Sequence, residues 1–129
     1  MSDQPIRVLV LDDNELHLEL VERSLSGDGF DVRLAETIAD MQRIAAGFDP
    51  DIMLVDMNLP DTPRERVVTA AREAAPRAGI VICSAWEESR LRGLCKELGA
   101  DGYISKSESM MAIGRRLTEM RSSGILARR

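Results

Sequence analysis

Residues 52–60 read IMLVDMNLP: four apolar residues, an aspartate at position 56, and a turn sequence that ends in Pro60. An unbroken apolar run of this length, bounded by turn residues, is typical of a parallel strand covered on both faces. Two similar runs, VLVL at residues 8–11 and IVIC at residues 80–83, lie on either side of it in the chain. Strands buried on both faces need helices on both sides of the sheet, so these runs predict an α/β fold.

The alternation of strand and helix patterns extends over the whole chain. Strands are predicted at residues 6–11, 30–34, 52–55, 80–84 and 102–105, and helical periodicity fills the segments that follow them. In the first of these segments, for example, Leu18, Val21 and Leu25 share one face. The pattern predicts a single doubly wound (βα)₅ domain with right-handed crossovers.

Length, charge and cysteine content exclude several classes of protein. The chain has 129 residues, which suits one domain, and its net charge of −5 without a long basic run argues against direct nucleic-acid binding. Its apolar runs fall short of the ~20 residues that cross a bilayer, and the N-terminus lacks a signal-peptide pattern. Cys83 and Cys95 lie in apolar patterns, as expected in a reduced compartment. We therefore expect a cytoplasmic protein with no membrane association.

Residues that carry chemistry follow four of the five predicted strands. In an open α/β sheet, ligands gather beyond the carboxyl ends of the strands. The residues found there, in chain order, are Asp12, Asp13, Asp56, Ser84 and Lys106. Three carboxylates at one edge repel one another unless a cation joins them, and oxygen ligands of this kind suit Mg²⁺.

Asp56 is the central residue of this set because its strand lies inside the sheet. A carboxylate can attack phosphorus to give an acyl phosphate, and the transferred phosphoryl group needs its oxygens neutralised. Mg²⁺, the Lys106 ammonium, and the Ser84 hydroxyl with a neighbouring backbone N–H can each take one of these oxygens. The set therefore predicts phosphoryl transfer to Asp56.

Four motifs, each at a strand end, resemble the receiver domains of bacterial two-component response regulators. They are VLVLDDN at residues 8–14, IMLVDMNLP at 52–60, VICSA at 81–85 and GYISK at 102–106. The resemblance covers about residues 6–120, so we expect a receiver domain at residues 1–121 and a C-terminal tail or linker stump at 122–129. It implies a flavodoxin-like fold with a five-stranded parallel sheet in the order 2-1-3-4-5.

The resemblance also implies roles for the acidic residues. Asp56 would be the phosphoacceptor. Asp12, Asp13 and Asp56 would bind Mg²⁺ through their carboxylates, and Asn58 would bind it through its backbone carbonyl. No enzymatic turnover is implied beyond self-catalysed phosphorylation and dephosphorylation of the aspartate.

Three further residues receive roles from the resemblance. Ser84 and Lys106 would contact the phosphoryl group, and Ser84 with Tyr103 would form a switch that changes the surface of the fourth helix, fifth strand and fifth helix. The phosphodonor would be a sensor histidine kinase or a phosphotransfer protein. The changed surface would control a partner, a phosphorylation-dependent homodimer, or an output domain, which could bind DNA if the full chain is longer.

Two positions depart from the family pattern. The family commonly has proline directly after the lysine of the last strand, often with a cis bond, whereas this chain has Ser107. Glycine is usual eight positions after the phosphoacceptor, whereas this chain has Arg64. We therefore expect an atypical loop at residues 61–65 and a less constrained bond after Lys106.

Other functions use parts of the same pattern. Phosphohydrolases of the haloacid-dehalogenase kind also have a strand-end aspartate, but they need a second acid two residues later, where this chain has Asn58, and no cap insertion is present. A flavodoxin-like cofactor binder needs a phosphate loop after the first strand, where Asp12 and Asp13 would repel phosphate.

Simpler interpretations remain for individual residues. Asp12 and Asp13 could cap the first helix, since aspartate is a favoured N-cap. His17, the single histidine, is expected to be structural or exposed. A receiver that acts as an unphosphorylated adaptor is a further alternative, and the intact set of site residues argues against it.

Overall fold

The fold is an alternation of strands and helices in a computed structural model that describes residues 4–106 and 110–125. The elements are, in order, β1 (Arg7–Leu11), α1 (Glu15–Gly27), β2 (Asp31–Ala35), α2 (Ile38–Phe48), β3 (Ile52–Asp56), α3 (Arg64–Ala74), β4 (Gly79–Ser84), α4 (Glu88–Leu98), β5 (Gly102–Ser105), the 3₁₀ turn η1 (Met110–Ala112) and α5 (Ile113–Ser122).

The five strands form one parallel sheet in the order β2-β1-β3-β4-β5. This is the predicted doubly wound, flavodoxin-like topology, so the expected fold class is confirmed. β3 lies at the centre, and all five of its residues are buried. Because the strands are parallel, the segments that follow β1, β3, β4 and β5 meet at the same edge of the sheet.

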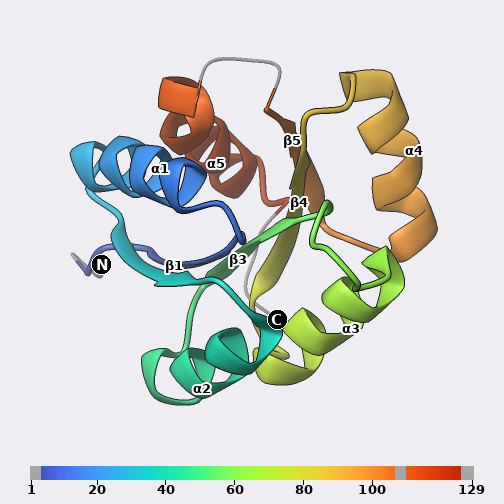
Figure 1. Ribbon diagram of the computed structural model, residues 1–129. Coiled ribbons are helices and arrows are strands. Elements are labelled where there is room, and N and C mark those ends of the chain that lie inside the picture. Colours follow the sequence, from blue (N-terminus) through green and yellow to red (C-terminus); the bar gives the residue numbers. More distant parts are fainter. Residues whose placement is uncertain (1–3, 107–109, 126–129) are drawn as a thin grey trace.

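Helices cover both faces of the sheet: α1 and α5 lie on one face, and α2, α3 and α4 lie on the other (Figure 1). Alternate residues of β1 serve the two faces. Val8 and Val10 belong to the apolar cluster under α1 and α5, whereas Leu9 and Leu11 belong to the cluster under the other three helices. The unbroken apolar run of β1 is explained by this double burial.

Some element bounds differ from those predicted by one residue. β2 begins at Asp31 because the backbone N–H of Asp31 bonds to the carbonyl of Ile6, a pairing that hydropathy does not reveal. β3 extends to Asp56, which pairs in register with Cys83 of β4. The strand ladder therefore fixes the backbone of Asp56. At the other end of the chain, α5 extends one residue into the predicted tail.

Two further observations concern the described parts of the chain only. Within residues 4–106 and 110–125, no helix is long and apolar enough to cross a membrane. Ser107 and the bond that precedes it lie outside the described residues.

Candidate functional site

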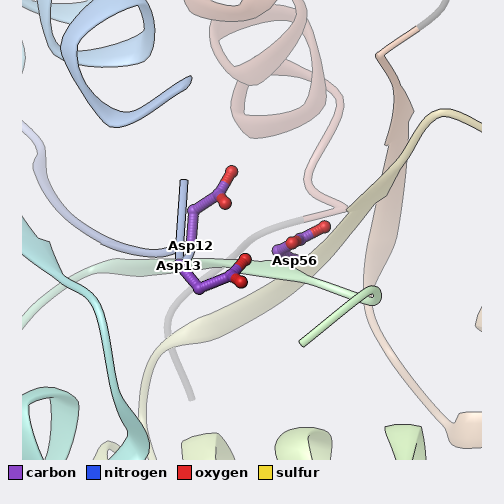
Figure 2. A group of neighbouring side chains, drawn as sticks. All are labelled: Asp12, Asp13 and Asp56. Atoms are coloured by element: carbon purple, nitrogen blue, oxygen red, sulfur yellow. The ribbon is translucent and has the colours of Figure 1, made fainter. Parts of the chain in front are cut away.

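Three carboxylates gather at the carboxyl edge of the sheet, as the sequence predicts. Asp12 and Asp13 follow β1, Asp56 ends β3, and one oxygen of each lies within 4.8 Å of the others (Figure 2). Asp12 and Asp56 are buried, and Asp13 is exposed. They line a pocket of about 210 Å³, which exceeds the ~30 Å³ that one water occupies in the liquid and leaves space for a hydrated ion.

The turn after β1 places the two aspartates. Asp12 accepts a hydrogen bond from the backbone N–H of Asn14 at 2.9 Å through Oδ1. Asn14 is the N-cap of α1, and its Oδ1 accepts from the backbone N–H of His17 at 3.1 Å. The cap of α1 is therefore Asn14. Neither Asp12 nor Asp13 has that task, and the capping interpretation of the acidic pair is wrong.

Lys106 supplies the positive charge of the site. Its Nζ lies 2.8 Å from Asp12 Oδ2 and 3.3 Å from Asp56 Oδ1, and its side chain is only 9% exposed. Burial alone would lower the pKa of Lys106, but the hydrogen bond to Asp12 and the nearby negative charges raise it above its ordinary value. The ammonium is therefore charged at neutral pH and offsets part of the repulsion between Asp12 and Asp56.

Asp56 has a pKa raised from its ordinary value. Burial is the main cause, and the charge of Asp12 adds to it. Lys106 and a backbone hydrogen bond from Asn58 act in the opposite direction without cancelling the effect. A carboxylate whose charged form is disfavoured by burial destabilises the fold when it is ionised.

Asp56→Asn should therefore make the metal-free protein more stable at neutral pH. Because the pKa of Asp56 is raised in the folded state, protonation of its carboxyl stabilises the fold. This contribution is fully present below the ordinary pKa of 3.8 and is lost as pH rises through the raised pKa of the folded state. The gain from the substitution should thus grow as pH rises from acid to neutral. Urea unfolding of both proteins in EDTA at several pH values measures it. A variant that is less stable than wild type at neutral pH would contradict this assignment.

Ser84 lies next to the pocket and is fully buried. Its Oγ accepts hydrogen bonds from Asn58 Nδ2 and from the backbone N–H of Trp86, both at 3.3 Å. Asn58 itself lines the pocket. The backbone carbonyl of Ser84 accepts from the N–H of Lys106 at 2.6 Å, which joins the ends of β4 and β5.

Tyr103 does not line the acidic pocket. It lies half-buried on β5 and packs against the cluster under α2, α3 and α4. Its hydroxyl accepts a hydrogen bond from Arg92 Nε of α4 at 3.2 Å. The structure therefore brings the acidic residues, Asn58 and Lys106 together, keeps Ser84 adjacent, and places Tyr103 at the contact between α4 and β5.

Comparison with known proteins identifies the family. A family model described as the response regulator receiver domain matches residues 8–118. The chain belongs to this family. The resemblance drawn from the four motifs is therefore confirmed, and the matched segment includes every site residue and all five strands except Arg7, the first residue of β1.

Individual relatives agree with this membership. The chain is 37% identical over 102 residues to the transcriptional regulatory protein PrrA of Mycobacterium tuberculosis, covering 78% of this chain and 43% of PrrA. It is 32% identical over 99 residues to the photosynthetic apparatus regulatory protein RegA of Rhodovulum sulfidophilum, covering 77% of this chain and 54% of RegA. The chain thus spans about half the length of these curated relatives.

Solved structures support the fold. A response regulator from Thermotoga maritima superposes with a TM-score of 0.78 at 22% identity, over 92% of this chain and 98% of that one. The chemotaxis response regulator CheY4 of Vibrio cholerae gives a TM-score of 0.76 at 20% identity, over 89% and 98% of the two chains.

His17 is a residue of this receiver domain that sequence reasoning missed. The structure places its Nδ1 3.3 Å from Lys106 Nζ and 3.5 Å from Asp12 Oδ2, at the wall of the pocket. Its side chain is 38% exposed, so the expectation of a structural or exposed histidine stands, but the contact with Lys106 was not predicted. A lone histidine has no sequence signature for such a contact, although His17 lies in the first turn of the helix that begins at the carboxyl edge of the sheet.

Arg64, the departure from the family's usual glycine, contacts Trp86. Its guanidinium lies 4.3 Å from the centre of the Trp86 ring, and that of Arg90 lies 3.4 Å from it. These contacts join the first turns of α3 and α4 to the loop after β4. In the loop before α3, Asp61 has a left-handed backbone conformation with φ of 60°.

Proposed function

We propose that this receiver domain accepts a phosphoryl group on Asp56 with the help of Mg²⁺ and signals through its α4, β5 and α5 surface. The observation that carries the proposal is the contact of Lys106 with the buried Asp56, within a cluster of three carboxylates. A charged pair of this kind, at the carboxyl edge of a central strand, suits a carboxylate that must receive a phosphoryl group.

The donor set of the pocket fits Mg²⁺. Asp12, Asp13 and Asp56 each offer a carboxylate oxygen, and these oxygens lie close enough together to share one ion. No softer ligand belongs to this group of carboxylates, and hard oxygen ligands are those Mg²⁺ prefers. We also propose the backbone carbonyl of Asn58 as a ligand. Bound Mg²⁺ would neutralise the acidic cluster and withdraw charge from one phosphoryl oxygen.

Three residues of the site would each have a separate role in the reaction. A carboxylate oxygen of Asp56 attacks phosphorus, and a bond forms between them while the bond from phosphorus to the donor breaks, leaving its electron pair on the donor atom. Lys106, already in contact with Asp56, stabilises negative charge on a second phosphoryl oxygen. The Ser84 hydroxyl donates a hydrogen bond to a third oxygen, once Ser84 gives up the hydrogen bonds it now accepts from Asn58 and Trp86.

The output follows from the movement of Ser84. When its hydroxyl turns toward the phosphoryl group it vacates space, and Tyr103 can swing inward and release Arg92. Such a change alters the surface between α4 and α5. We propose that a sensor histidine kinase or phosphotransfer protein is the phosphodonor, and that a partner, an output domain or a second copy of the chain binds the changed surface.

The free thiols of Cys83 and Cys95 suit a cytoplasmic location.

The phosphohydrolase alternative gains no support from the geometry. The position two residues after Asp56 would have to protonate a leaving group. It is occupied by Asn58, whose amide donates to Ser84. We therefore propose no catalytic turnover on an external substrate.

Trp86 emission tests the proposal, because Trp86 is the single tryptophan and its backbone N–H bonds to Ser84. Beryllofluoride, a phosphoryl analogue, should change the emission saturably when Mg²⁺ is present. Asp56→Asn should abolish the beryllofluoride response. Asp61→Asn, which changes an exposed acid whose left-handed backbone asparagine tolerates, is the matched control and should respond as wild type. A full response in Asp56→Asn would place the acceptor elsewhere.

A further inference from the structure

We propose that His17 is a positioning residue that holds the Lys106 ammonium in place for phosphoryl transfer. The inference rests on the proposed function of Asp56 as phosphoacceptor and adds a residue to that machinery. It depends on one juxtaposition: the imidazole Nδ1 of His17 lies 3.3 Å from Lys106 Nζ at the wall of the acidic pocket.

The ammonium of Lys106 has three N–H donors and three acceptors around it. A lysine ammonium donates three hydrogen bonds and accepts none. Asp12 Oδ2 lies 2.8 Å from Nζ, and Asp56 Oδ1 and His17 Nδ1 lie 3.3 Å from it. Because the side chain is 9% exposed, a donor without an acceptor here would be poorly satisfied by water. His17 therefore completes the set that fixes the ammonium.

His17 is itself held by the segment that carries the acidic pair. Its backbone N–H donates to Asn14 Oδ1, and Asn14 in turn donates its backbone N–H to Asp12. The imidazole is thus attached to the same turn as the carboxylates that it faces. The proposal requires Nδ1, which also lies 3.5 Å from Asp12 Oδ2, to be the unprotonated nitrogen that accepts from Lys106, with the proton on Nε2.

An ammonium with three fixed acceptors cannot rotate freely. Its donor toward Asp56 stays directed at the place where the phosphoryl group arrives, which is the kind of preorganisation that stabilises developing charge. Without His17, one donor lacks its acceptor and the side chain can turn toward Asp12 or toward solvent. Loss of His17 should therefore slow phosphoryl transfer while the metal-binding carboxylates remain.

Two substitutions at position 17 distinguish the effect of the hydrogen-bond acceptor from the effect of side-chain bulk. His17→Leu keeps a side chain of similar bulk without an acceptor, whereas His17→Asn places an amide oxygen near the position of Nδ1. With acetyl phosphate and saturating Mg²⁺, His17→Leu should phosphorylate Asp56 about tenfold more slowly than wild type, and His17→Asn should recover most of the rate. The Mg²⁺ dissociation constant should change by less than about twofold in both variants.

The ring nitrogens give a readout that does not depend on activity. His17 is the single histidine, so its signals need no assignment. Long-range ¹H–¹⁵N spectra of the metal-free protein at about pH 8 should show the Nε2–H tautomer. A proton on Nδ1 would overturn the proposal, because that nitrogen could not accept from Lys106.

The kinetic outcomes separate the two proposals. If wild type takes no phosphoryl group on Asp56, the proposed function fails and the role of His17 fails with it. If wild type is phosphorylated and His17→Leu reacts at the same rate, only the role of His17 fails. The positioning role would also be overturned if His17→Asn were phosphorylated as slowly as His17→Leu. It would likewise be overturned if His17→Leu lost only Mg²⁺ affinity.

Discussion

Lys106→Met should lower the free energy of unfolding of the metal-free protein by about 3 kcal/mol at neutral pH. The reason is that the substitution leaves Asp12 and Asp56, whose side chains are 4% and 5% exposed, without the cation that contacts both. For a domain of this size the loss corresponds to a fall in melting temperature of roughly 10 °C. Thermal and urea unfolding in EDTA measure it.

Two further variants show whether the loss of stability in Lys106→Met arises from its contacts with the aspartates. Lys96→Met removes an exposed lysine from α4 and should change stability by less than ~0.5 kcal/mol. The double variant Lys106→Met/Asp56→Asn removes one of the buried charges and should recover a large part of the stability. If Lys106→Met is as stable as Lys96→Met, the contacts of Lys106 with the aspartates contribute little, and the electrostatic description of the pocket is wrong.

Asp13→Asn should remove most of the stabilisation that Mg²⁺ gives to the fold. At a free concentration one hundred times its dissociation constant, a ligand that binds only the folded state adds about 2.7 kcal/mol. In EDTA the same substitution should have an effect within ~0.5 kcal/mol, because Asp13 is exposed. Thermal unfolding of both proteins, with EDTA and with millimolar Mg²⁺, gives the two differences.

The control for Asp13→Asn is Asp61→Asn, which removes an exposed acid outside the carboxylate cluster. This variant should keep the full shift with Mg²⁺. An Asp13→Asn protein that also keeps the full shift would exclude Asp13 as a ligand, and the proposed metal site would have to be built from Asp12 and Asp56 alone.

The main geometry of the site could be predicted because it follows from topology. Once β1, β3 and β5 are recognised as parallel strands of one sheet, Asp12, Asp56 and Lys106 must lie at the same edge, whatever their separation in sequence. The observed contacts of Lys106 with both aspartates agree with that reasoning. Strand bounds were predicted less well, since they depend on backbone pairing as well as on hydropathy.

What could not be predicted depends on side-chain direction. A lone histidine in a helix carries no signature, and His17 contacts Lys106 only because Asn14 sets where α1 begins. The contacts of Arg64 and Arg90 with Trp86 likewise join three segments whose approach is decided by loop paths. Sequence periodicity predicts which face of a helix or strand a residue occupies, but it does not predict which residues it contacts across a loop.

Intact mass spectrometry after incubation with acetyl phosphate and Mg²⁺ tests the central proposal most directly. The wild-type chain should gain the mass of one phosphoryl group, the adduct should be lost in both acid and base, and Asp56→Asn should gain none. An adduct of equal yield on Asp56→Asn, or no adduct on the wild-type chain, would contradict the proposal that Asp56 is the phosphoacceptor.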